Sequence, residues 1–132
     1  MLTQDAAVSI YEVHGAQVNA MPQAHRFDWA LNPLPAVAFP RLEYRVTDAT
    51  ALDERDRFWV INYFYPGDLD LTSQSDPLAI RYGRGATHRQ QRRVERLVEL
   101  AYGDLKISLT RTPTIQLTLS SSPRNWEGIV RL

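Results

Sequence analysis

Hydrophobic and polar residues follow their most regular pattern between residues 87 and 103, THRQQRRVERLVELAYG. Apolar side chains fall at i, i+3, i+4 and i+7, the spacing of one helical face: Val94, Leu97, Val98 and Ala101. Arginines repeat this spacing on the roughly opposite face: Arg89, Arg92, Arg93 and Arg96. The pattern predicts a long amphipathic helix over about 87–102, with one face packed on an apolar surface and guanidinium groups on the other.

The predicted helix also has suitable ends. Thr87 followed by Gln90 is a capping-box pattern, and Gly103 suits the residue just after a last helical turn. Before it, residues 66–86, PGDLDLTSQSDPLAIRYGRGA, have no clear period and predict a long loop that joins a strand to this helix.

The first 36 residues are less regular. Residues 4–14, QDAAVSIYEVH, fit one helical face, although their β-branched residues favour a strand; we predict a helix and keep the strand as the alternative. Residues 16–36 contain three prolines and predict a second long loop, a kind of segment that often contacts a partner. Phe27, Trp29 and Leu31 alternate within it, as in a short edge strand or an anchoring arm.

A β-hairpin is predicted between Leu42 and Tyr65. Residues 42–46 alternate apolar and polar side chains, which is typical of a strand with one solvated face. Residues 58–65, FWVINYFY, are almost continuously apolar, so this strand is expected to be buried on both faces, by its own domain or by a neighbouring subunit. The charged residues 53–57, DERDR, are expected to form the exposed turn.

Three short strands are predicted after the helix, over residues 105–109, 115–119 and 126–132. The resulting order is helix, strand, strand, helix, strand, strand, strand. This order suggests one α+β domain over residues 1–132: a mostly antiparallel sheet of about four or five strands, the long helix on one face, and a shorter N-terminal helix.

Composition narrows the classes of function. The formal net charge is zero, so a whole-protein basic field for nucleic acid or membrane is absent. Lys106 is the sole lysine among 15 basic residues; the arginines suit interfaces and phosphate contacts, and a GC-rich genome would also produce them. Without cysteine, disulfides and thiolate metal sites are excluded. Neither a signal peptide nor a membrane span is expected, which favours a cytoplasmic or assembly-bound protein.

No convincing catalytic, cofactor-binding or metal-binding constellation is found. The three histidines lack metal-ligand spacing and are expected to be surface or packing residues. The aspartates of the second loop, Asp68, Asp70 and Asp76, lack the glycine and the glutamate that a calcium loop needs. Asp104 and Lys106 form the D-x-K half of a metal-dependent nuclease site, for which Asp68 is the candidate upstream carboxylate.

Two arginine features have competing interpretations. Gly83-Arg84-Gly85 resembles an anion-binding nest before a helix, and a flexible entry to the helix explains it as well. The arginine stripe suits a solvated salt-bridged face, a protein interface or a nucleic-acid backbone. Glu95 and Glu99 beside it, in a neutral chain, place nucleic acid last.

The layout as a whole resembles a known family. AFPRLEYRVTD leads to the apolar FWVINYFYPG and an extended loop, and RQQRRVERLVELAYGD then precedes closing strands. This order, over most of the chain, is similar to that of the tail-terminator or tail-completion proteins of long-tailed phages and of related neck proteins.

The resemblance implies a ring-forming structural protein of the virion, commonly a hexamer, that caps the tail tube and joins it to the head connector. Its partners would be copies of itself and those virion proteins, in the host cytoplasm during assembly, with no cofactor, no membrane, and nucleic acid at most passing through a channel. On this basis we predict an interface formed by these residues: Arg84, Arg89, Arg92, Arg93 and Arg96, with Trp29, Trp59 and Tyr63 as anchors.

We therefore predict a non-enzymatic assembly subunit. A small monomeric binding module, such as an immunity or nucleic-acid-binding protein, is the first alternative. A small metal-dependent nuclease that uses Asp104 and Lys106 is the second.

Overall fold

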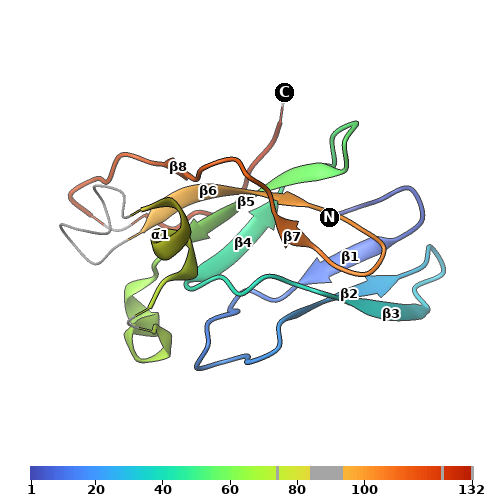
Figure 1. Cartoon of the computed structure of the whole chain (residues 1–132), viewed down its shortest axis with the longest axis horizontal. Coiled ribbons are helices and arrows are strands. Elements are labelled where there is room, and N and C mark those ends of the chain that lie inside the picture. Colours follow the sequence, from blue (N-terminus) through green and yellow to red (C-terminus); the bar gives the residue numbers. More distant parts are fainter. Residues whose placement is uncertain (74, 84–93, 123, 132) are drawn as a thin grey trace.

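Two antiparallel sheets form the body of the molecule in the computed structural model (Figure 1). The structure describes residues 1–73, 75–83, 94–122 and 124–131. The first sheet has the order β1 (Ala7–Ile10), β2 (Gln23–Phe27), β3 (Pro33–Ala38). The second has the order β4 (Arg45–Ala49), β5 (Arg57–Tyr63), β6 (Glu95–Ala101), β7 (Ser108–Leu109), and β8 (Ile115–Gln116) also pairs with β6. The helices described are η1 (Pro66–Leu71) and α1 (Pro77–Tyr82).

The predicted fold class is wrong, because the described part of the chain contains no long helix. Residues 95–101 of the predicted helix form β6, and residues 84–93, which hold its first turns, lie outside the described residues. The two helices that are described have six residues each. The sheet content therefore exceeds the prediction, and the architecture is two packed sheets rather than one sheet with a helix on its face.

β6 is a strand because both of its edges pair with other strands and most of its side chains are buried. It pairs with β5 along seven residues, and it meets β7 and β8 on its other edge. Val98 and Leu100 lie opposite Val60 and Phe58 and enter the core. The apolar spacing of this segment is compatible with a helix, but a central strand with two buried faces also accepts it, provided that its charged side chains are paired.

The N-terminal third is also more extended than predicted. The alternative of a strand within residues 4–14 is correct, since β1 occupies Ala7–Ile10. The predicted loop over 16–36 is wrong, because it contains β2 and the first four residues of β3. Pro33 and Pro35 are tolerated in β3 because it lies at an edge of the first sheet, where prolines in strands are usually found.

The predicted hairpin between residues 42 and 65 is confirmed. β4 and β5 are antiparallel, with Arg45 opposite Tyr63 and Val46 opposite Asn62. The strands are shorter than the alternating pattern suggested. The turn between them contains Asp56 at a positive φ of 56°.

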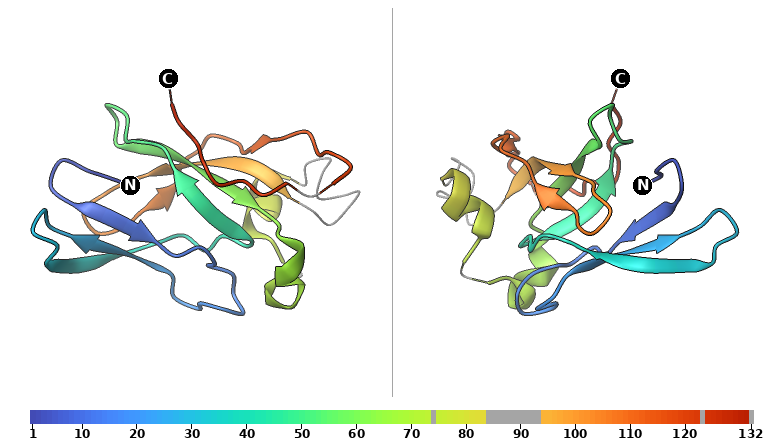
Figure 2. Two further views of the ribbon diagram at one scale, coloured as in Figure 1. Left: turned by 180° about the vertical axis from the view of Figure 1, so that it is seen from behind. Right: turned by 45° about the vertical axis from the view of Figure 1, so that its right-hand side comes forward.

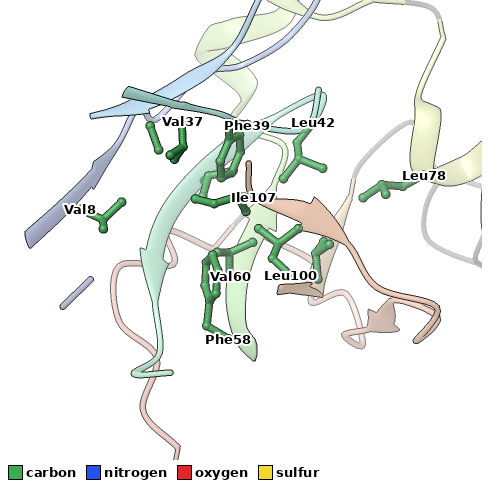
Figure 3. Packing of buried hydrophobic residues seen from close by; sticks show 12 residues of the cluster. Val8, Val37, Phe39, Leu42, Phe58, Val60, Leu78, Leu100 and Ile107 are labelled. Atoms are coloured by element: carbon green, nitrogen blue, oxygen red, sulfur yellow. The ribbon is translucent and has the colours of Figure 1, made fainter. Parts of the chain in front are cut away.

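Apolar side chains from both sheets meet in one core (Figure 3). Val8 and Val37 come from the first sheet, and Phe58, Val60 and Leu100 from the second. Full burial of one side chain of this size contributes about 1.5–3 kcal/mol to the stability of the fold. This shared core fixes the two sheets against each other.

The C-terminal segment after β8 crosses the outer face of the second sheet (Figure 2, left). The predicted final strand over 126–132 is wrong for residues 126–131, which are irregular, and Leu132 lies outside the described residues. The hydroxyl of Thr47 on β4 donates to the Trp126 carbonyl at 2.5 Å, and the Asp48 carboxylate accepts from the Ile129 N–H at 2.9 Å. These two bonds hold the C-terminal segment against β4. Among the described residues, no helix is long and apolar enough to cross a membrane.

Candidate interaction surface

Arg96, a predicted interface residue, is buried inside the molecule. Its side chain is 2% exposed and makes a two-bonded ion pair with Asp76, which is 1% exposed, at 2.6 and 3.1 Å. Its Nε donates to Asn62 on β5 at 2.8 Å. Asp76 also caps α1 by accepting from the Leu78 N–H. The predicted interface role of Arg96 is replaced by a structural one, because this network ties α1 to the second sheet.

Tyr63 and Trp59 are also less accessible than the prediction of interface anchors requires. Tyr63 is buried, and its hydroxyl donates to Asn125 of the C-terminal segment at 2.6 Å. Burial raises the pKa of this phenol. Trp59 is half-buried on the same strand. Within the aromatic run, Tyr63 is thus covered by the chain's own C-terminal segment.

The same C-terminal segment neutralises a buried carboxylate of β6. Glu95 is ion-paired with Arg124 and accepts a hydrogen bond from the Trp126 indole N–H at 2.8 Å. The predicted interface residues Arg84, Arg89, Arg92 and Arg93 lie outside the described residues. Trp29 is therefore the one predicted interface residue that the structure describes as largely exposed.

Trp29 lies in the turn between β2 and β3, which we call the Trp29 turn (residues 28–32). The indole is 59% exposed and Leu31 is 74% exposed. Asp28 organises this turn: its carboxylate accepts from the N–H groups of Ala30 at 2.9 Å and Asn32 at 2.8 Å, and from the Asn32 side chain at 2.9 Å. The hydrogen bonds from Asn32 hold the pKa of Asp28 below its usual value.

Leu31 has a left-handed backbone conformation, with φ at 64°. Such a conformation costs a leucine roughly 1–2 kcal/mol, and it is the kind of local strain that concentrates at functional sites. The indole N–H of Trp29 donates to the Gln4 carbonyl at 3.2 Å and so fixes the ring beside the N-terminal segment. The turn therefore holds two large apolar side chains in water in a fixed arrangement.

A groove of about 790 Å³ lies at the same end of the molecule. Five acidic residues line it together with a single arginine, Arg26: Asp5, Asp53, Glu54, Asp56 and Asp104. We call it the carboxylate groove. The Arg26 guanidinium donates to the Asp104 carbonyl at 3.5 Å, and Asp53 is paired with Arg131 at 3.1 Å. The remaining carboxylates give the groove an excess of negative charge.

The residues that suggested a nuclease, Asp68 on one side and Asp104 and Lys106 on the other, do not lie together. Asp68 is held by Arg45 through contacts of 2.5 and 2.9 Å, and this pairing raises the pKa of the arginine. η1, which carries Asp68, and the loop after β6, which carries Asp104, lie at opposite ends of the molecule (Figure 1). In the described part of the chain, no three acidic or histidine side chains are grouped so that they could hold a metal ion. The D-x-K motif therefore lacks its expected partner.

His14 is a packing residue, as expected for the histidines. Its ring is fully buried and stacks on Phe39, with centroids 4.3 Å apart. Neither ring nitrogen has a hydrogen-bond partner. Burial lowers the pKa of His14 from 6.5 to about 4. The nearby Tyr11 backbone raises this pKa, but by less than burial lowers it.

The sequence predicted Trp29 as an interface anchor but gave no such role to Leu31 or to the carboxylate groove. The pattern Asp28-Trp-Ala-Leu-Asn32 is a turn signal that could have located the Trp29 turn, because aspartate and asparagine side chains commonly close such turns. The carboxylate groove had no such signal, since its residues come from segments that are far apart in the sequence.

Comparisons of this chain with protein-family models, with curated proteins and with solved structures found no match. Its role must therefore be inferred from its own side chains.

Proposed function

We propose that this chain is a structural subunit that acts by binding copies of itself and neighbouring proteins, without catalysis. In its finer form the proposal is a ring-forming tail-terminator or neck subunit of a tailed-phage-like particle. The observation that carries the assembly role is the Trp29 turn, which presents two large apolar side chains on a rigid frame.

The energetics of the turn favour a protein partner. Burying an exposed side chain of the size of Leu31 yields about 1.5–3 kcal/mol, and tryptophan is among the residues that contribute most at protein interfaces. Because Asp28 already fixes the turn, little conformational entropy is lost when it binds. The left-handed conformation of Leu31 persists because this frame enforces it.

The order of elements no longer supports the phage form of the proposal. The order of elements that suggested this family includes two helices, and the structure has strands at residues 7–10 and 95–101 in their place. What supports an assembly role now is the surface: exposed apolar side chains beside a charged groove, and interior polar groups committed to structural pairs. Closed rings of one size in negative-stain electron micrographs would support the phage form, and open filaments would contradict it.

The double variant Trp29→Ser, Leu31→Gly should weaken self-association at least about tenfold, the equivalent of about 1.4 kcal/mol, because two apolar anchors are lost. Its thermal stability should remain close to that of the wild type, since both side chains are exposed and glycine relieves the strain at the positive φ. The measurements are sedimentation velocity over a range of concentrations and thermal unfolding.

Met21→Ser is the matched control. Met21 is 80% exposed and lies just before β2, at the other extremity of that strand from the Trp29 turn. Its loss should leave self-association unchanged. Equal association of the wild type and the double variant would rule out the Trp29 turn as the contact that carries the proposal.

A further inference from the structure

We propose that copies of this chain exchange their C-terminal segments, so that the segment of one copy lies on the second sheet of another. This inference rests on the proposed function and names the contact that would join the copies. We call residues 124–131 the strap; it crosses the outer face of the second sheet (Figure 2, left). The site for a partner's strap is the one that the chain's own strap fills in the structure.

The strap is held by side-chain contacts rather than by strand pairing. Among the residues that the structure describes, those of the strap belong to no strand or helix. Arg124 and the indole N–H of Trp126 both bind the carboxylate of Glu95 on β6, which is 4% exposed. On β5 the hydroxyl of Tyr63 donates to Asn125 at 2.6 Å. Such directional polar contacts select the sequence of the strap, whichever copy supplies it.

The far end of the strap reaches the carboxylate groove, close to the Trp29 turn. Arg131 pairs with the groove residue Asp53 at 3.1 Å. Gln4, which also lines the groove, accepts the hydrogen bond from the Trp29 indole. The end of an exchanged strap would therefore lie at the groove of the partner, near the partner's own Trp29 turn.

Exchange replaces each contact of the strap with an identical one, so the contact energy of either copy changes little. Domain swapping is a low-cost route to oligomers for this reason. The described residues between β8 and the strap, 117–122, form no strand and include three consecutive serines; they are the part of the chain that would change direction. The net gain on association then comes from new contacts between copies, for which the exposed apolar side chains of the Trp29 turn are available.

Cross-linking of two single-cysteine copies tests the exchange, since the chain has no cysteine of its own. One copy carries Glu54→Cys, in the turn between β4 and β5 and next to Asp53, and the other carries Arg131→Cys; both positions are exposed. Because Arg131 pairs with Asp53, exchange places position 131 of one copy beside position 54 of another. A short bismaleimide added after incubation at high concentration would then join the two copies.

Two controls accompany this mixture. The matched control mixes Glu54→Cys with Met21→Cys, at an exposed position that makes no described contact with the strap. The double variant Glu54→Cys, Arg131→Cys at low concentration should form an intramolecular link, which shows that the linker spans the pair. Near-UV circular dichroism checks that each variant is folded.

The covalent heterodimer on a denaturing gel should be at least about tenfold more abundant in the 54–131 mixture than in the control, since exchange holds the two thiols at an effective concentration on the order of millimolar. Equal yields from the two mixtures, while sedimentation velocity shows that the wild type assembles, would mean that each strap stays on its own sheet. That result would overturn the exchange and leave the assembly role standing. A wild type that is monomeric at every concentration would overturn both.

Discussion

Replacing Arg96 with methionine should lower the free energy of unfolding by about 3–5 kcal/mol, as is typical when one partner of a buried ion pair is removed. The change leaves the Asp76 carboxylate buried without its cation and removes the hydrogen bond to Asn62. It also loosens the attachment of α1, since Asp76 caps that helix. Urea unfolding of the wild type and the variant at pH 7 measures the difference.

The partner variant makes this prediction specific. Asp76→Asn keeps an acceptor for the Leu78 N–H and removes the buried charge. The double variant Arg96→Met, Asp76→Asn should therefore be more stable than Arg96→Met alone. Arg111→Met, at an exposed arginine, should change stability by no more than about 0.5 kcal/mol. A loss below about 1 kcal/mol for Arg96→Met would show that this pair is not the structural tie described above.

Acidification should destabilise the protein through His14. The pKa of His14 is about 4 in the folded protein and 6.5 in the unfolded chain, so the unfolded chain binds the proton more tightly. The contribution of the neutral, buried ring is fully present above pH 6.5 and is lost as the pH falls toward 4. The shift corresponds to about 3 kcal/mol.

His14→Leu isolates this effect from the titration of carboxylates. Leucine preserves the apolar contact with Phe39 and cannot take up a proton, so the variant should lose less stability than the wild type between pH 6.5 and pH 4. Urea unfolding at intervals of pH gives both curves. Parallel curves over this window would mean that His14 keeps an ordinary pKa in the folded protein.

The hairpin of β4 and β5 could be predicted because its signals are local. The alternation before residue 47, the charged turn and the apolar run from Phe58 all reflect burial within one pair of strands. The expectation that β5 is buried on both faces was also sound. The sequence could not show that the cover is the chain's own C-terminal segment, because that contact joins Tyr63 to Asn125, 62 residues later.

β6 was misassigned because the sequence hides its burial. Arg96 and Glu95 look like residues of a solvated helical face, yet both are inside, each neutralised by a residue 20 or 29 positions away. Such distant pairing is invisible to a local periodicity. The apolar residues around them, Val94, Leu97, Val98 and Ala101, fit a helix and a strand equally well, so tertiary contacts decided the outcome.

The surface was predictable only in part. Trp29, predicted from the sequence as an interface anchor, is exposed as such a role requires, and the role itself stays a prediction. The conformation of Leu31 depends on hydrogen bonds from Asp28, and the carboxylate groove is assembled from four separate stretches of the chain. Neither follows from spacing in the sequence.

The central claim is that this protein works by assembling with itself. Sedimentation velocity of the wild-type chain over a wide range of concentrations, at physiological salt, tests it most directly. We predict that the mass rises with concentration above the 15.1 kDa of a single chain toward a defined oligomer. A mass that stays at 15.1 kDa across the whole range would contradict the account.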